Sequence, residues 1–136
     1  MIAAVCSWHE HHGQAAGEIQ RRLQRRERMA VAAPALVEAY SVLTRLPPPH
    51  RLSPEDSMML LEANFIKGAK LIALQVGDYQ DLLRQAPKNG IAGGQTYDAV
   101  IAVCAIKAKA SALLTFNPGD FLFAAKQIDI IVPGTV

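Results

Sequence analysis

The sequence predicts an α/β fold built around a mostly parallel sheet. Segments whose apolar residues recur at helical spacing alternate with short apolar runs, and this alternation is typical of parallel strands joined by crossover helices. Turn-forming residues separate the segments, as at 47–49, 89–90 and 93–94. The 136 residues carry no internal repeat, low-complexity tract or linker. We therefore expect residues 1–136 to form a single domain.

The first half of the chain predicts several helices and one strand. Apolar residues recur at roughly helical spacing through residues 1–28, which indicates one helix, or two with a break near Gly13. We expect residues 29–33 to form a short buried strand. A helix over 34–46 has a proline in its first turn and ends before three consecutive prolines. Ser53 then caps a further helix, whose first turn is acidic.

The second half alternates strands and helices more regularly. We expect a strand, or a loop with strand character, over 69–74, helices over 78–85 and 96–109, and strands over 112–115 and 128–132.

Composition and charge bear on nucleic-acid binding, disulfide bonding and cellular location. The net charge of +2 is too small to establish a nucleic-acid partner by itself. Cys6 and Cys104 lie far apart and form no CxxC pattern, which fits a reducing compartment. The opening residues lack the features of a signal peptide, and no run of about 18 apolar residues follows. We therefore expect a cytoplasmic protein with no membrane partner.

Glu38 is the first candidate for a catalytic side chain. It lies in a helix that is apolar on almost every face, so we expect the helix to be buried and the carboxylate to need a partner or a metal. Two other readings stay open. Glu38 could pair with Arg45, or its carboxylate could simply reach the surface.

Four further candidates surround the last helix and the strand after it. Asp98 lies in the first turn of that helix, where a negative charge is favourable even without a catalytic role. Thr115, Asn117 and Asp120 follow the strand and offer the hydroxyl, amide and carboxylate oxygens that magnesium accepts. The alternative is an ordinary capped turn, because Asn-Pro-Gly-Asp is common turn chemistry.

Histidines and arginines near the start of the chain raise two weaker possibilities. His9 and His12 could share a helix face, but no HExxH pattern accompanies them, so a solvated helix face is favoured over a metal site. A basic stripe follows, in which RNA backbone contact and pairing with Glu18 and Glu27 are both possible. Its candidate RNA contacts are Arg21, Arg25 and Arg28.

Taken together, these segments resemble the PIN-domain ribonucleases, most closely the bacterial toxins of VapBC type. The resemblance spans most of the chain in the family's order. The matching pieces are a histidine-containing helix near the start, APALVEAYSVLTRLP around Glu38, GIAGGQTYDAVIAVCA around Asp98, and LLTFNPGDF around Asn117 and Asp120.

The resemblance implies a three-layer α/β sandwich that holds Mg²⁺ or Mn²⁺ on acidic side chains and cleaves RNA. Glu38 matches the acid of the family's second motif and Asp98 the acid of the third. Asn117 falls at the fourth position, and Asp120 matches the acid three residues on. Glu38, Asp98 and Asp120 would be catalytic metal ligands, with Asn117 and Thr115 in support. A small antitoxin protein, a homodimer and an RNA substrate are the implied partners.

The first strand of the family and the aspartate at its end have no match in this chain. The resemblance therefore implies an N-terminally truncated PIN-like domain, with weaker metal binding. We hypothesise a start codon assigned too late, which predicts that the DNA upstream encodes, in frame, a short apolar run ending in Asp.

Three functions are compatible with these observations. The leading prediction is a magnesium-dependent ribonuclease, the toxin of a toxin–antitoxin pair. The alternative is a catalytically impaired PIN-like domain that binds an antitoxin or itself. A phosphate-binding, receiver-like domain is a weaker third reading, because the acidic pair and the lysine that it needs are not evident.

Overall fold

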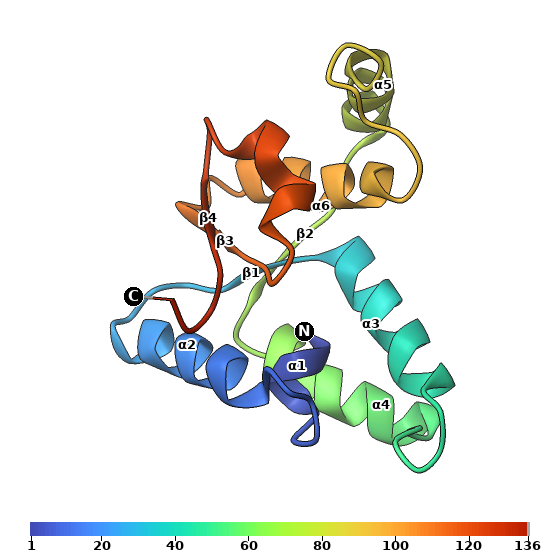
Figure 1. Ribbon diagram of the computed structural model, residues 1–136, viewed down its shortest axis with the longest axis vertical. Coiled ribbons are helices and arrows are strands. Elements are labelled where there is room, and N and C mark those ends of the chain that lie inside the picture. Colours follow the sequence, from blue (N-terminus) through green and yellow to red (C-terminus); the bar gives the residue numbers. More distant parts are fainter. Residues whose placement is uncertain (136) are drawn as a thin grey trace. The chain divides into compact units, whose positions relative to one another are not determined.

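Short strands alternate with helices in the computed structural model, which describes residues 1–135 (Figure 1). The chain divides into two compact units, residues 1–71 and 72–135. This alternation confirms the predicted mixed α/β class.

The first unit is mainly helical. Its elements are α1 (Ile2–Val5), α2 (His12–Gln24), β1 (Ala30–Ala32), α3 (Ala33–Arg45), α4 (Pro54–Leu61), the π-helical turn η1 (Glu62–Ile66) and β2 (Lys70–Ile72), whose last residue belongs to the second unit. The strand-or-loop alternative at 69–74 is decided in favour of a strand, because β2 pairs with β1. The Lys70 N–H donates to the Met29 carbonyl at 2.9 Å beside this pair.

A single hydrophobic core holds the first unit together. It gathers side chains from α1 to η1, namely Cys6, Val31, Ala39, Leu43, Leu61 and Phe65. Burying these groups removes apolar surface from water, at about 25 cal/mol per Å². α3 packs against α1, β1 and α4, so the helix that carries Glu38 is supported on several sides.

Local sequence signals set two of the helix starts in this unit. The Ser53 hydroxyl accepts a hydrogen bond from the Asp56 N–H at 3.0 Å, which confirms the predicted cap of α4. The break in the N-terminal helical segment falls at residues 6–11 and not near Gly13, so that part of the prediction is wrong. Gly13 lies in the first turn of α2, where few intrahelical hydrogen bonds depend on it.

The second unit contains the parallel strand pair. Its elements are α5 (Val76–Gln85), α6 (Gln95–Lys107), β3 (Ala112–Leu114), the 3₁₀ helix η2 (Pro118–Ala124) and β4 (Asp129–Ile131). β3 and β4 run parallel, with Ala112 opposite Asp129 and Leu114 opposite Ile131. The predicted parallel pairing is thus confirmed, and the strands of the described chain form two two-stranded sheets, β1–β2 and β3–β4.

The core of the second unit lies between α6, η2 and the β3–β4 pair. Ala102, Leu113, Phe121, Ala124 and Ile128 are its buried members. α6 contacts both α5 and η2 (Figure 1). This packing holds the start of α6, with Asp98, in the same unit as the segment that follows β3.

Two predictions from composition can be compared with the structure. Cys6 and Cys104 are buried and free, and burial raises the pKa of both thiols. Within residues 1–135, we find no helix with the length and apolar character that a bilayer crossing requires.

Candidate functional site

Glu38 lies on the solvent-facing side of α3. Ala39 and Leu43 point into the core, whereas Val37, at 72% exposure, and Glu38 face water. The prediction of a buried carboxylate is therefore wrong, because the exposed face of this helix carries apolar residues as well as polar ones. The Glu38 carboxylate reaches the surface, as one of the other two readings expects. Among residues 1–135, the ion pairs do not include one between Glu38 and Arg45.

The Glu38 carboxylate interacts electrostatically with the amino group of Met1. Burial lowers the pKa of that ammonium, and the negative charge of Glu38 opposes the shift. Since α1 also packs against α3, Glu38 lies near the beginning of α1 within the first unit.

Asp98 lies in the first turn of α6, as predicted. The turn before the helix is closed by Gly93, at φ +59°, whose carbonyl accepts from the Thr96 N–H at 3.1 Å. Glycine adopts this left-handed backbone without the strain of a side chain. Asp98 is half-buried, while the next residue, Ala99, points into the protein at 1% exposure. The carboxylate is thus positioned where the helix dipole stabilises negative charge.

Three hydrogen bonds hold the segment after β3 in place. The Thr115 N–H donates to the Ile131 carbonyl at 3.0 Å, which extends the parallel pairing by one residue. The Asn117 N–H donates to Thr115 Oγ1 at 3.0 Å, and the Asp120 N–H donates to the Asn117 carbonyl at 3.1 Å. Asn117 and Asp120 are exposed. The Asn-Pro-Gly-Asp segment therefore forms a turn without a side-chain cap from Asn117, and it presents an amide and a carboxylate to solvent.

The second unit brings several oxygen donors onto neighbouring elements. Asp98 lies in the first turn of α6, Asp120 lies in the first turn of η2, and these two helices pack against each other. Magnesium is commonly held by only one or two protein carboxylates together with water and phosphate oxygens. The donor chemistry of Asp98 and Asp120 fits Mg²⁺, or Mn²⁺, which accepts the same ligands. No group of three or more His, Cys, Asp or Glu residues in the described part of the chain could hold a metal ion.

The predicted basic stripe on α2 divides into two parts. Arg21 pairs with Glu18, and Arg22 pairs with Glu18 at 2.8 Å and with Glu27 at 2.9 Å. The hydrogen bonds from Arg21 and Arg22 lower the pKa of Glu18. For these two arginines, the reading as pairing with Glu18 and Glu27 is confirmed.

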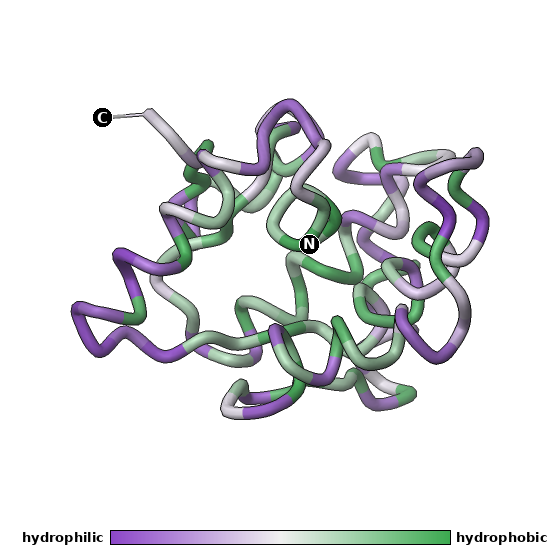
Figure 2. The backbone as a smooth tube through the Cα atoms, turned by 90° about the horizontal axis from the view of Figure 1, so that it is seen from below, coloured by the Kyte–Doolittle hydropathy of each residue, from purple (hydrophilic) through white to green (hydrophobic). Residues whose placement is uncertain are grey.

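The arginines beyond the end of α2 behave differently. Arg25, Arg26 and Arg28 are exposed, and none of the ion pairs within residues 1–135 includes them. They lie in the hydrophilic turn between α2 and β1, seen at the far left of Figure 2. We call Arg25, Arg26 and Arg28 the arginine turn.

The histidines near the start of the chain do not form one helix face. Only His12 lies in α2, where its Nδ1 is 2.8 Å from the Ala3 carbonyl, whereas His9 and His11 lie in the turn before it. The possibility that His9 and His12 share a helix face is therefore excluded. The His11 N–H donates to His9 Nδ1 at 3.1 Å, so this ring nitrogen is engaged by backbone. These contacts favour a structural role over a metal site.

Sequence reasoning missed a pair of stacked rings in the first unit. The Trp8 and His50 rings have centroids 4.1 Å apart and an interplanar angle of 23°. The two residues belong to different loops, before α2 and after α3. Local periodicity carries no signal for such a contact, because neither residue lies in a regular element.

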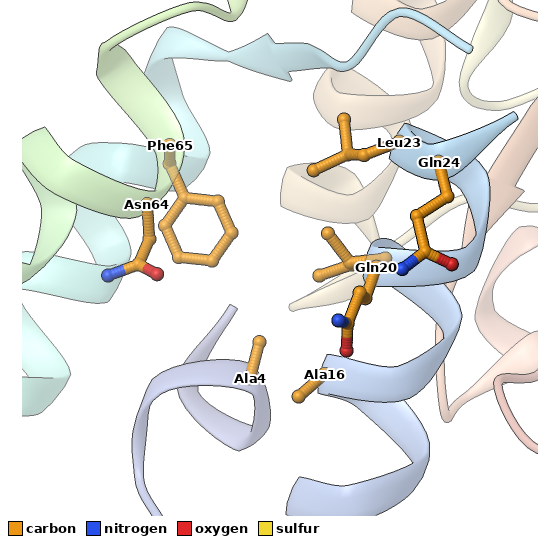
Figure 3. Close-up of a pocket in the computed structure, with 8 residues that line it drawn as sticks. Ala4, Ala16, Gln20, Leu23, Gln24, Asn64 and Phe65 are labelled. Atoms are coloured by element: carbon orange, nitrogen blue, oxygen red, sulfur yellow. The ribbon is translucent and has the colours of Figure 1, made fainter. Parts of the chain in front are cut away.

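The first unit contains a groove. It has a volume of about 440 Å³ and lies between α1, α2 and η1. Ala4 and Ala16 lie on one part of its wall, and Leu23 faces Phe65 across it (Figure 3). None of the sequence-predicted site residues lines this groove.

Comparisons with known proteins agree on one family. Residues 1–126 match the PIN domain. Ribonuclease VapC40 of Mycobacterium tuberculosis, in two strains, is 36% identical over 115 residues, which is 85% of this chain and 79% of that protein. Ribonuclease VapC27 of the same organism is 40% identical over 81 residues, which is 60% of this chain and 57% of that protein.

A solved structure supports the same fold. A chain in the crystal structure of VapBC2 from Rickettsia felis, bound to a DNA fragment from the promoter, matches with a TM-score of 0.65. The match covers 96% of this chain and 95% of that chain at 18% identity, so it speaks for the fold alone. The PIN-like fold implied by the sequence motifs is thereby confirmed. From the domain match and the identity to VapC40, the chain belongs to the PIN-domain family, in its VapC group.

Proposed function

We propose that this protein is a metal-dependent endoribonuclease of VapC type, the toxin component of a toxin–antitoxin pair. The observation that carries the proposal is the 36% identity, over most of both chains, to a protein named ribonuclease VapC40. The acids on α6 and η2 supply the oxygen chemistry that such an activity needs. A cytoplasmic location is part of the proposal, because both cysteines are free thiols.

The proposed metal ligands are Asp98 and Asp120, which would hold Mg²⁺ or Mn²⁺. When bound, such an ion lowers the pKa of a coordinated water and offsets charge on the scissile phosphate. Glu38 is the third proposed catalytic carboxylate, on the strength of the sequence motif. Its exposure on α3 leaves it accessible to solvent and substrate.

Asn117 and Thr115 have a positioning role in this proposal. The Thr115 hydroxyl accepts from the Asn117 N–H, and the Asn117 carbonyl accepts from the Asp120 N–H. These two hydrogen bonds fix the backbone from Thr115 to Asp120 and thereby position the Asp120 side chain. Neutral groups can do this without adding repulsion between like charges at an anionic site.

RNA cleavage by the purified protein tests the proposal directly. We expect cleavage with Mg²⁺ or Mn²⁺, loss of cleavage with chelator, and loss with Asp98→Asn or Asp120→Asn. Asp81→Asn is a matched control, because Asp81 is an exposed aspartate of the same unit whose only ion pair within residues 1–135 is a long contact of 3.6 Å with Arg84. Asn117→Ala should lower activity about 10- to 100-fold, as outer groups around metal sites do.

The alternative function, a PIN-like binding module without catalysis, predicts a different result. Such a protein would bind its antitoxin but would cleave no RNA under any metal condition. Cleavage that survives both chelator and Asp98→Asn would contradict the proposed metal mechanism.

The proposed protein partners are an antitoxin and a second copy of this chain. The structural relative comes from a complex named VapBC2, which supports the antitoxin. For self-association, the exposed side chains of Met58 and Met59 border a shallow groove of about 770 Å³ on α4 and η1. Leu61, in the last position of the same helix, is buried in the core at 2% exposure.

A further inference from the structure

Four aromatic rings form a continuous row on two loops of the first unit. His50 stacks on Trp8, the Trp8 and His9 centroids are 5.9 Å apart, and those of His9 and His11 are 5.7 Å apart. Trp8 is the only tryptophan of the chain, and its side chain is 45% exposed. We call His50, Trp8, His9 and His11 the ring row.

Backbone contacts hold both loops in place. In the first loop, the His9 N–H donates to the Cys6 carbonyl at 3.0 Å, and His11 N–H donates to His9 Nδ1. In the second loop, the His50 N–H donates to the Pro47 carbonyl at 3.0 Å, and Arg51 Nε donates to the Leu46 carbonyl at 2.8 Å. The rings are thus pre-organised, which reduces the entropy that a ligand must overcome on binding.

The part of the Trp8 indole that remains in water, beside polar groups, is suited to a planar ligand. The His50 ring stacks on one face of the indole, and the His9 ring is tilted by 44° to it, so the exposed part of the indole offers a flat heterocycle a surface for stacking. Arg51, an exposed cation, follows His50 directly in the sequence, and the acid Glu10 lies 3.5 Å from His11. A ring beside a cation suits a base attached to a phosphate.

We propose that the ring row is a stacking platform for bases of single-stranded RNA, with Trp8 as its central contact. The inference rests on the proposed ribonuclease function, because it assigns a binding surface to the same substrate. Proteins that bind single strands combine aromatic side chains, on which bases stack, with cations that follow the backbone. The arginine turn supplies such cations at the far end of α2, about 20 Å along the helix from His12.

The intrinsic fluorescence of Trp8 tests the proposal in the unmodified protein. Because Trp8 is the only tryptophan, any change in indole emission reports on the ring row. We expect a short unstructured RNA, added with chelator and checked for integrity afterwards, to quench this emission. An abasic ribose-phosphate strand of equal length should leave the emission unchanged.

Variants test whether the ring contributes to affinity. Trp8→Ala should weaken binding of labelled RNA roughly 5- to 100-fold, the range for removal of one stacking aromatic side chain. Trp8→Phe, which keeps a ring, should lose less than Trp8→Ala. Tyr79→Ala is the matched control, because Tyr79 is a 40% exposed aromatic residue in the second unit. Circular dichroism of each variant checks that it is folded.

The outcomes separate this inference from the proposed function. Equal quenching by abasic RNA, or unchanged affinity in folded Trp8→Ala, overturns the platform even if the protein cleaves RNA. Quenching by an antitoxin but not by RNA also overturns it, in favour of a protein contact. Base-dependent quenching with a loss of affinity in Trp8→Ala supports the platform, even if no cleavage is found and the proposed enzyme activity fails.

Discussion

Lys107 Nζ lies 3.1 Å from Asp78 Oδ2, which links the last turn of α6 to the first turn of α5. The same carboxylate oxygen accepts from the Gln75 N–H at 2.8 Å and completes a capping box at the start of α5. Lys107 also reaches the Ala73 carbonyl at 3.4 Å. One aspartate thus joins a helix cap to a contact between helices.

This arrangement predicts a pH-dependent stability. The Gln75 N–H, and after it Lys107, lower the pKa of Asp78. A lowered pKa in the folded state contributes stability above the unfolded value, which is about 3.9, and this contribution is lost as the pH falls through the folded pKa. We expect Asp78→Asn to lower Tm at pH 7, with the difference from the wild type shrinking at pH 3. Asp81→Asn should change Tm little at either pH, and a constant Asp78→Asn difference would contradict the linkage.

Leu43 is the best test of the first core. Its side chain is 0% exposed, so Leu43→Ala should lower the free energy of unfolding by about 2 to 5 kcal/mol through lost burial and a residual cavity. Val37→Ala changes another apolar residue of the same helix that is 72% exposed, and should stay within about 0.5 kcal/mol. Urea unfolding of both variants measures the difference. A similar loss of unfolding free energy in both variants would contradict the assignment of Leu43 to the core.

Ser57 is a buried polar residue in α4. It is 0% exposed, and its hydroxyl has no hydrogen-bond partner in the described residues. An unsatisfied buried hydroxyl costs about 1 to 3 kcal/mol. We expect Ser57→Ala to be neutral or to raise the free energy of unfolding. Ser57→Val should lower it by about 1 to 3 kcal/mol through overpacking, and a clear loss of stability in Ser57→Ala would reveal a partner for the hydroxyl.

The arginine turn predicts a change in the salt dependence of RNA binding. Each phosphate neutralised on a single strand contributes about 0.7 to the slope of log K against log salt. Replacing both Arg25 and Arg28 with Ala should therefore reduce the magnitude of the slope by roughly 1.4. Arg21→Ala is the control, because Arg21 is held by Glu18. Filter binding over a range of salt concentrations measures the slopes. Equal effects of replacing Arg21, Arg25 and Arg28 would contradict the distinction between paired and exposed arginines.

Self-association is predicted to involve the exposed methionines of α4. Met59 is 69% exposed, so Met59→Glu should place a charge in the proposed interface and shift a dimer toward monomer, because a buried unpaired charge is costly. Analytical ultracentrifugation of the wild type and the variant measures this shift. Leu122→Glu changes a 70% exposed apolar residue of the second unit and is the control. If the dimer tolerates Met59→Glu but not Leu122→Glu, the interface does not involve the α4 methionines and instead includes Leu122.

Most helices and strands could be predicted from the sequence because their signals are local. The Ser53 cap, the prolines around α3 and the short apolar runs each mark an element within a few residues. α5 begins two residues before the expected 78, at Val76, because Gln75 and Asp78 cap each other, and a Gln N-cap is a weak signal in sequence.

The candidate acids were identifiable, but their surroundings were not. Asp98 and Asp120 lie in the first turns of their helices, as the pattern around each suggested. The exposure of Glu38 was misjudged because apolar residues such as Val37 also occupy the solvent face of α3. Burial depends on what packs against a helix, and periodicity in one helix carries little information about its neighbours.

By itself, the sequence determined the order of helices and strands, the family motifs around Glu38, Asp98 and Asp120, and the chemical type of each donor. Only the tertiary structure decided that Trp8 stacks on His50, that Lys107 reaches Asp78, and that Arg21 and Arg22 are engaged by acids while the arginine turn stays exposed. The reason is physical. Caps, turns and periodicity act over a few residues, whereas stacking and most ion pairing depend on which distant segments the cores bring together.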